Sequence, residues 1–302
     1  MTSKILTDDE VTAFTKRAYG YIEMAPNYSN WAPIKSIPDG YTYKYYKATR
    51  VPRAKASKDG RDYKDVQMAR TEAEANIVSF RYGFSIPRVT VEMARQANVP
   101  IWDENFEAVY RHLDNMIAHL ALEGSNATFD SVLISGLRDG GTDIGATTDA
   151  LLWGTVTKPF ANAAAIWGAL NTAGFGDRTS LKWIVSSNLA GYLKTKYGAG
   201  DPAEEQLVKE TFGFDIIYLP LGTTTELHTY PIGAASADDG VFFAFPKDED
   251  VWHIAEVMPV TVTMNPTLDV ESNAYKGFLE WRGTVAIVQA TGVQYSNSCN
   301  IA

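Results

Sequence analysis

Residues 41–70 read YTYKYYKATRVPRAKASKDGRDYKDVQMAR, and the interpretation of the whole chain starts from them. This stretch holds nine Lys or Arg residues against three Asp residues, a net charge of +6. The chain has 302 residues and a net charge of −9, which leaves −15 on the other 272 residues. A basic segment on an acidic body finds a ready partner in another copy of that body. The charge pattern therefore predicts self-association.

The same region has the pattern of a long β-hairpin. Tyr41, Tyr43 and Tyr45 alternate with other residues as in a strand, and alternation returns at 75–84, ANIVSFRYGF. Between these two stretches, residues 52–65 are polar, with Gly60 near their middle. So long a hairpin with few core residues is expected to project from its domain.

A projecting basic hairpin suggests a contact between subunits. A loop rich in Lys and Arg is usually only a solvated surface, but Tyr and Arg anchor protein interfaces and both occur here. We therefore predict an inter-subunit interface formed by Tyr43, Tyr45, Lys47, Arg50, Arg53, Lys55, Lys58, Arg61 and Lys64.

The composition indicates a soluble protein that is made inside the cell. The N-terminal residues MTSKILTDDEVTAF lack the apolar run of a signal peptide, and no stretch approaches the ~20 apolar residues of a membrane span. The single cysteine, Cys299, excludes an intrachain disulfide. The acidic net charge argues against a general nucleic-acid binder, although the basic segment keeps that option open.

The best helix of the chain is expected at Asp103–Glu123. Asp103 suits the N-cap and Gly124 the C-terminal stop. Apolar residues recur between them with the spacing of one helix face. We predict a core-facing stripe that includes Phe106, Tyr110, Leu113, Ile117 and Leu120.

The remaining pattern predicts a mixed α+β chain without internal repeats. Short helices are expected at 8–19, 92–97, 160–172, 187–197 and 203–212. Residues 20–40 are expected to be irregular. Strands are expected at 182–186, 215–219 and 241–245, and over most of the last 50 residues.

The histidines do not predict a metal site. His112 and His119 lie seven residues apart, which is two turns of the long helix and too far for one zinc ion. His228 and His253 have no acidic or cysteine ligand at helpful spacing. All four are interpreted as surface or interface residues.

No other motif predicts catalysis. The segment GLRDGG at 136–141 lacks the GxxxxGK[ST] spacing of a phosphate-binding loop and is interpreted as a plain loop. The acidic groups at 103–104 and 248–250 are interpreted as solvated caps and turns. We therefore expect no catalytic residues, no bound metal and no cofactor.

The order of the elements resembles the major capsid protein of tailed double-stranded DNA viruses. IPRVTVEMARQA leads into a long helix ending in HLALEG, followed by ISGLRDGG. LKWIVSSNLAGYLKTK then precedes a helix and FDIIYLPLG, and FLEWRGTVAIVQATGVQY follows near the C-terminus. This order is similar to the Hong Kong 97-type fold, which encapsulin shells share, and the likeness covers nearly the whole chain.

The resemblance implies a division of the chain into units. Residues 1–38 would be an N-terminal arm and 39–86 an extended loop, or β-hairpin, that lies over the neighbouring subunit. Residues 87–150 and 247–302 would form a peripheral domain around the long spine helix at 103–123, with 247–302 supplying its return strands. Residues 151–246 would form an axial domain at the centre of each capsomer.

The resemblance also implies a function. The chain is expected to be a structural protein of a virion, made in the host cytoplasm. It would assemble with itself as pentamers and hexamers into an icosahedral bacteriophage capsid. The shell would enclose double-stranded DNA without reading its sequence, and portal, scaffold or decoration proteins are further partners. Some family members crosslink a loop Lys to a neighbour's Asn, and Lys55, Lys58 and Lys64 lie in the corresponding region.

Two alternatives remain open at this stage. The first is an encapsulin-like nanocompartment shell that packages cargo enzymes. Encapsulins generally begin with a helix that helps to hold cargo, whereas the long irregular segment at 20–40 favours a virus. The second alternative is a nucleic-acid-binding protein that uses the basic hairpin, for which binding by the monomer would weaken steeply with salt.

Overall fold

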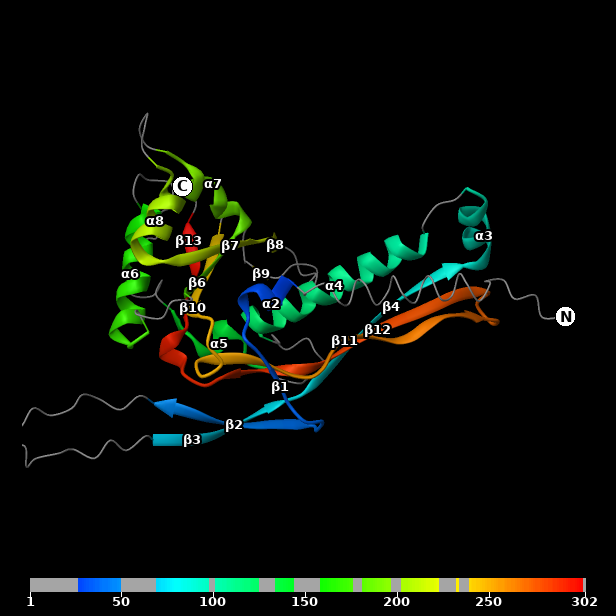
Figure 1. Cartoon of the computed structure of the whole chain (residues 1–302), viewed down its shortest axis with the longest axis horizontal. Helices are drawn as coiled ribbons and strands as arrows, with labels where there is room; N and C mark the ends of the chain where they lie inside the picture. The colour runs from blue at the N-terminus through cyan, green and yellow to red at the C-terminus, as the bar shows by residue number, and fades with distance from the viewer. Residues whose placement is uncertain are drawn as a thin grey trace, which may run out of the picture.

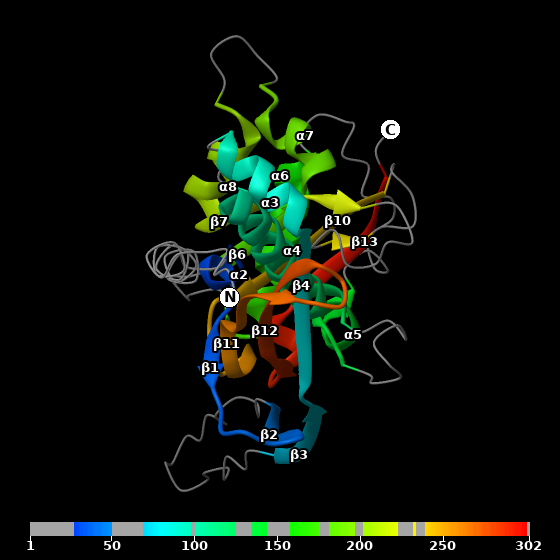
Figure 2. The same ribbon diagram turned by 90° about the vertical axis from the view of Figure 1, so that its right-hand side faces the viewer.

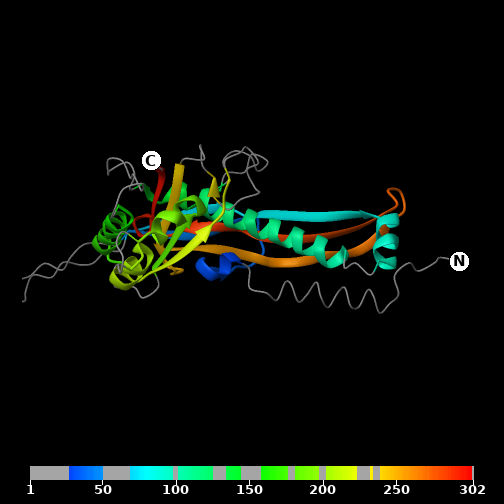
Figure 3. The same ribbon diagram turned by 90° about the horizontal axis from the view of Figure 1, so that it is seen from above.

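Two β-sheets and one long helix organise the chain in a computed structural model (Figure 1). The structure describes residues 27–49, 69–97, 101–124, 134–143, 158–175, 181–196, 202–222, 232–233 and 239–300. The molecule is elongated, with one sheet running along its length and the second sheet gathered with three helices at one end (Figures 1 and 3). None of the described helices is long and apolar enough to cross a membrane.

The first sheet has four strands and carries the long helix. Its order is β1 (Ile34–Ser36), β11 (Trp252–Asp269), β12 (Ala274–Ile287) and β4 (Val78–Pro87), with β1 parallel to β11 and the other pairs antiparallel. Helix α4 (Ile101–Glu123) lies along this sheet (Figure 3). Helix α3 (Arg88–Gln96) follows β4 at the far end of the sheet.

The apolar stripe of α4 is buried against the sheet. Phe106, Leu113, Ile117 and Leu120 are at most 2% exposed, while Tyr110 is only partly buried and packs at the margin of the core. The helix begins at Ile101, two residues earlier than the sequence indicates. Its last turn is enclosed on all sides because it runs into the junction between the two sheets.

The end of α4 is sealed by the Gly-rich segment that follows it. Gly124 adopts a positive φ of 77°, as helix-terminating glycines do. A Cβ on Gly136 would lie 2.1 Å from the Gly124 nitrogen, so this close approach requires glycine. The expected plain loop contains one helical turn, α5 (Leu137–Gly140), and its Arg138 pairs with the buried Glu123 at 2.6 Å.

The second sheet has five strands. Its order is β5 (Thr142–Asp143), β13 (Gln294–Asn300), β10 (Asp239–Pro246), β6 (Leu181–Ser186) and β7 (Phe214–Leu219). Beside it lie α6 (Lys158–Thr172), η1 (Ser187–Leu189), α7 (Ala190–Lys194) and α8 (Glu204–Phe212). The buried Glu204 side chain accepts a hydrogen bond from the Phe160 backbone N–H at 2.8 Å, which ties α8 to α6. The remaining elements are β8 (Leu221–Gly222), β9 (Ile232–Gly233) and η2 (Ala290–Gly292).

An aromatic cluster joins the two sheets. Trp31 from α2 (Asn27–Trp31) stacks on Trp252 of β11 with ring centroids 6.0 Å apart. Phe245 of β10 completes the cluster, with its ring 4.8 Å from that of Trp252. All three side chains are almost fully buried. Because they come from α2 and from both sheets, the two sheets form one packed unit.

A buried carboxylate reinforces this junction. Glu256 of β11 accepts hydrogen bonds from the Tyr28 hydroxyl and the Trp281 indole N–H, each at 2.7 Å. Burial, followed by the nearby Glu256 charge, raises the pKa of Tyr28 well above its usual range, so the phenol stays protonated and remains a donor.

Strand β11 is longer than its partner. It has 18 residues against 14 in β12, and four register shifts absorb the four extra residues. One of these bulges contains the exposed Pro259. Each bulge adds local bend and twist, so the ribbon curves instead of lying flat.

One strand pairing expected from the sequence is wrong, and the last strand lies in the five-stranded sheet. Only the first two residues of the alternating stretch 75–84 belong to the returning strand of the hairpin, because β4 leaves the hairpin and pairs with β12. The returning strand is β3 (Ala69–Asn76). At the C-terminus, β13 does not return to the sheet beneath α4 but pairs with β10 in the five-stranded sheet. Alternation predicts a strand but does not say which strand it pairs with.

The other expected elements form within a few residues of their predicted bounds, except that α3 begins four residues early and the helix expected at 187–197 is split into η1 and α7. The mixed α+β class is confirmed. The short helix expected at 8–19 lies outside the described residues. Residues 20–40, expected to be irregular, include α2 and β1.

The buried face of α4 should contribute strongly to stability. Leu113 has no exposed surface, so Leu113→Ala should lower the free energy of unfolding by about 2–5 kcal/mol. Arg111→Ala on the exposed face of the same helix is the matched control and should change it by less than about 0.5 kcal/mol. Urea unfolding followed by circular dichroism measures both, and equal effects would show that this face is not core.

Candidate assembly surface

A two-stranded stem projects from the body of the subunit. Strand β2 (Thr42–Thr49) pairs with β3 in an unbroken antiparallel register from Thr42–Asn76 to Thr49–Ala69. The stem runs beneath the body and points away from α3 (Figures 1 and 2). The basic residues Arg50, Arg53, Lys55, Lys58, Arg61 and Lys64 fall between its strands and lie outside the described residues.

The two faces of the stem differ in chemistry because side chains alternate along each strand. On one face, Tyr43 and Tyr45 lie opposite Ala75 and Ala73, and all four are partly buried. On the other face, Lys44 and Tyr46 lie opposite Glu74 and Glu72, and all four are exposed. The Lys44 and Glu72 side chains form an ion pair of 3.6 Å across this outer face.

The inner face binds to the subunit's own sheet through His253. The His253 Nδ1 atom lies 2.9 Å from the Glu249 carbonyl oxygen, and a carbonyl can only accept, so Nδ1 carries the proton. Burial lowers the pKa of His253, so the ring is neutral near pH 7. Its Nε2 atom is then an acceptor, and the Tyr43 hydroxyl donates to it at 3.1 Å.

Two further contacts hold the base of the stem. The Tyr45 ring stacks on that of Tyr43 at 5.8 Å, and burial raises the pKa of Tyr45, an effect that a backbone hydrogen bond with Ile287 opposes. Arg282 of β12 pairs with the Asp39 carboxylate at 2.5 Å and donates to the Gly40 carbonyl at 2.8 Å. The chain is therefore clamped where it enters the stem.

These positions change the list of interface candidates. Tyr43 and Tyr45, predicted from sequence to face a neighbour, contact their own subunit, while Lys47 is exposed. The most exposed aromatics of this region are Tyr41 at 88% and Tyr46 at 59%, and neither was among the candidates. The signal was present in YTYKYYK, where Tyr46 breaks the alternation and points to the opposite face from Tyr43 and Tyr45.

The histidines are less exposed than the sequence suggests. His119 and His253 are buried, at 4% and 2% exposure, and His112 is partly buried against the Tyr82 ring at 4.3 Å. His228 lies outside the described residues. Within the described ranges, no group of three or more His, Cys, Asp or Glu residues could hold a metal ion.

A cleft of about 420 Å³ opens at the junction between the sheets. Its lining includes Trp31, Asp114, Asp215 and Tyr218, and no Ser, Cys, Lys or His is among the described residues that line it.

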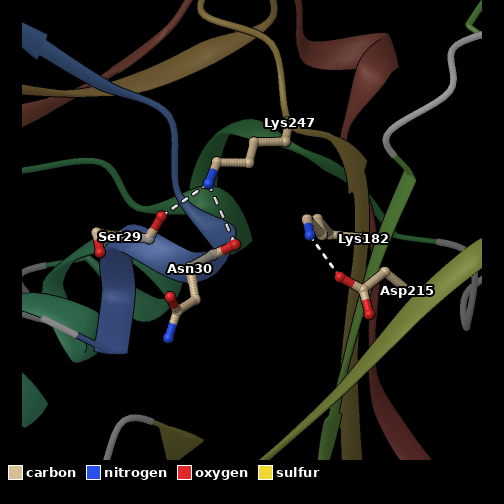
Figure 4. Close-up of polar contacts among 5 residues, drawn as sticks. All are labelled: Ser29, Asn30, Lys182, Asp215 and Lys247. Carbon is tan, nitrogen blue, oxygen red and sulfur yellow. Dashed lines mark hydrogen bonds and ion pairs between the residues drawn. The ribbon is translucent and has the colours of Figure 1, made fainter. Parts of the chain in front are cut away.

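Polar contacts beside this cleft tie α2 to the five-stranded sheet and link two strands of that sheet (Figure 4). Lys247 donates to the Ser29 and Asn30 carbonyls at 2.7 and 3.2 Å, and the Lys182–Asp215 ion pair of 2.5 Å lies beside it. Burial, and then the neighbouring Lys182 charge, lowers the pKa of Lys247. Both lysines are engaged in structural contacts.

Comparison with known proteins finds similarity in structure alone. No protein-family model and no curated protein matches the sequence. A virus-like particle from Pyrococcus furiosus is similar with a TM-score of 0.60 and 11% identity, over 95% of this chain and 98% of that one. The capsid of Myoviridae phage XM1 is similar with a TM-score of 0.58 and 12% identity, over 86% and 87%. The capsid of an empty GTA particle gives 0.59 and 11%, over 92% and 90%.

The chain has the Hong Kong 97-type capsid fold. The fold predicted from the order of sequence elements is thereby confirmed, although about nine residues in ten differ from each of these structures. The similar structures are a virus-like particle and two capsids, and the anchored stem is a described part of this chain that projects from its core.

Acidification should destabilise the subunit through His253. Its pKa in the folded state lies below the ordinary value of 6.5, so the unfolded chain takes up the proton first as the pH falls. The stabilisation that the neutral His253 ring gives to the folded state is complete above pH 6.5. It is lost as the pH falls through the lowered pKa of the folded state.

Urea-unfolding midpoints between about pH 7.5 and about pH 5 test this expectation. The natural sequence should lose stability faster than His253→Gln over this range. The pKa of His112 is also lowered by burial, but His112 is present in both proteins, so the difference reports His253 alone. Parallel pH profiles would show that the His253 ring does not titrate in this range.

Proposed function

We propose that this chain is the major capsid protein of a tailed double-stranded DNA virus. Copies of it assemble as pentamers and hexamers into an icosahedral bacteriophage capsid. The observation that carries the proposal is a projecting stem whose contacts with its own subunit, among the described residues, lie at its base, on a fold shared with a virus-like particle and a phage capsid. A stem with an exposed outer face and a basic tip segment is suited to contact a neighbour.

Charge supports a contact between copies. Residues 41–70 carry +6 and the remainder of the chain carries −15, so the tip of one subunit is attracted to the body of the next. We propose that Arg50, Arg53, Lys55, Lys58, Arg61 and Lys64 form this contact together with Lys47. Tyr43 and Tyr45 act indirectly, by holding the stem in position, and Tyr41 and Tyr46 are the exposed aromatic anchors.

We also propose the division into units that the resemblance implies, with one change. Residues 1–38 form an N-terminal arm and residues 39–86 the extended loop. Residues 87–150 and 247–293 form the peripheral domain, and residues 151–246 the axial domain. Residues 294–300 join the axial domain, because β13 pairs with β10 in the five-stranded sheet.

Double-stranded DNA is the proposed content of the shell, and an encapsulin-like shell with cargo enzymes is the second candidate. The similarity to the virus-like particle from Pyrococcus furiosus, which covers 98% of that chain, supports the second candidate as much as the first. Particles purified from the native source and treated with nuclease separate the two. Protected DNA supports a virion, and a co-purifying enzyme without DNA supports a nanocompartment.

Electron microscopy of the purified protein tests shell formation directly. Hollow closed particles are expected in negative stain. A protein that stays monomeric and binds DNA, with affinity falling steeply as salt rises, would contradict the proposal and support a nucleic-acid-binding protein.

Reversing the charge of the tip should block assembly without unfolding the subunit. Arg53→Glu, Lys55→Glu, Lys58→Glu and Arg61→Glu together change the charge by −8. Each exposed pair contributes only about 0–1 kcal/mol, but a closed shell repeats the contact in every subunit. Light scattering should show few shells while circular dichroism stays unchanged.

The matched control keeps the charge at the same positions. Lys55→Arg with Lys58→Arg should form shells at the yield of the natural sequence. Shell formation by the charge-reversed protein at that same yield would show that the tip is only a solvated loop. An unfolded charge-reversed protein would instead place the tip in the subunit core.

A further inference from the structure

The cleft at the junction between the sheets has the size of a small-molecule site. Its volume is about 420 Å³, which falls within the range of about 300–1,000 Å³ that ligand pockets occupy. Helices α2 and α4 and strand β7 all contribute to its lining. Figure 4 shows two of the lining residues, Asn30 of α2 and Asp215 of β7, on either side of the space between these elements. The proposed shell function makes no use of this cleft.

Two carboxylates give the cleft a negative charge. Asp114 of α4 is only 3% exposed, whereas Asp215 of β7 is exposed. No Lys, Arg or His is among the described residues that line the cleft. Burial, followed by the charges of Asp114 and Glu256, raises the pKa of Tyr110 to about 12, so the potential is also negative behind the α4 wall. The cleft therefore attracts cations.

The two lysines beside the cleft leave room for another cation. The Lys182 ammonium lies 2.5 Å from Asp215 Oδ2, but the two oxygens of a carboxylate together offer about four sites for hydrogen bonds. Lys247 donates to the carbonyls of Ser29 and Asn30. Both ammonium groups are thus held by partners outside the cleft lining or at its rim, and Asp215 can accept a further donor.

The rest of the lining suits the carbon chain of an organic cation. Trp31 and Tyr218 supply aromatic rings, and an ammonium group is attracted to the face of such a ring. The Tyr218 ring already has the Lys194 ammonium over one face, 5.0 Å from its centroid. Ile217 and Leu219 add aliphatic surface that methylene groups can contact.

This combination fits a linear diamine better than a metal ion or a single ammonium group. Mg²⁺ and Ca²⁺ take about six or more oxygen ligands, and no described group of three or more His, Cys, Asp or Glu residues could hold a metal. One ammonium group meets only one of the two carboxylates. A chain with an ammonium group at each end and methylene groups between them is complementary to both carboxylates and to the apolar lining.

We propose that this cleft binds an aliphatic diamine or polyamine, with one ammonium group at Asp114 and another at Asp215. The bound amine connects α4, which packs on the four-stranded sheet, with β7 of the five-stranded sheet. It therefore stabilises the junction between the two sheets. The inference goes beyond the proposed shell function and does not depend on it, because a single chain contains the whole cleft.

Calorimetric titration of the purified protein with putrescine, at constant ionic strength, tests the proposal. Putrescine should bind at one site per chain, roughly tenfold or more tightly than butylamine, which has the same carbon chain and one ammonium group. It should also raise the unfolding temperature, whereas Mg²⁺ at the same ionic strength should not. Equal binding of butylamine, or equal stabilisation by Mg²⁺, would indicate general charge screening and overturn the proposal.

N-acetyl-lysine amide separates a free amine from a lysine side chain of another polypeptide. It carries one ammonium group and should bind as weakly as butylamine. Tighter binding of this compound than of putrescine would mean that the cleft receives a lysine side chain, which would refute the proposed diamine.

Two substitutions that break the same ion pair should have opposite effects. Asp215→Asn removes the carboxylate and should weaken putrescine binding roughly tenfold. Lys182→Gln removes the competing ammonium group but keeps the carboxylate, so it should strengthen binding. Glu210→Gln, an exposed acidic position on α8, is the matched control and should bind like the natural sequence. Weaker binding in both ion-pair variants would show that the pair acts only on the structure.

Asp114→Asn tests the buried end of the cleft without changing the shape of the side chain. This variant should bind putrescine and butylamine with similar affinity, because only one carboxylate remains. Circular dichroism reports whether it folds. If it does not fold, the opposite effects expected of Asp215→Asn and Lys182→Gln still decide the proposal. A folded Asp114→Asn protein that keeps the full preference for putrescine would contradict it.

Discussion

The packing of Trp31, Phe245 and Trp252 is the contact on which the shape of the subunit depends. Each ring comes from a different element, so their burial holds α2 and the two sheets in one arrangement. The hydrogen bonds of Glu256 and the contacts of Lys247 act at the same junction and hold α2 in place. The proposed shell function requires a fixed angle between the two halves of the chain, because an error in each copy would accumulate around the shell.

The stem is a long projection that is nevertheless fixed to the body of the protein. Its base is held by Arg282 and by the hydrogen bond from Tyr43 to His253, while its outer face stays free for other contacts. Ordering the stem in the free subunit lowers the conformational entropy lost when a neighbour binds.

Sequence reasoning found the elements whose signal is local. The apolar stripe of α4 was visible because Phe106, Leu113 and Ile117 repeat with the helical period. The partners of β4 and β13 were not, since alternation at 75–84 looks the same in a hairpin and in a sheet. The hydrogen bond of Tyr43 to His253 could not be predicted, because the two residues are 210 positions apart in the sequence and nothing near Tyr43 indicates its partner. The exposure of Tyr46 could have been predicted, because it directly follows Tyr45 and so faces the opposite side of the strand from Tyr43 and Tyr45.

The bulges of β11 have a consequence for the concentrated state in which such a subunit exists. Beyond the three residues that pair with β1, no other described strand covers the outer edge of β11, and an open edge invites the strands of other molecules. Four register shifts and the exposed Pro259 break that edge into short, bent pieces. The edge strands of neighbouring copies therefore cannot pair with one another over a continuous stretch. Edge-to-edge pairing of crowded copies, which leads to fibrils, is therefore disfavoured.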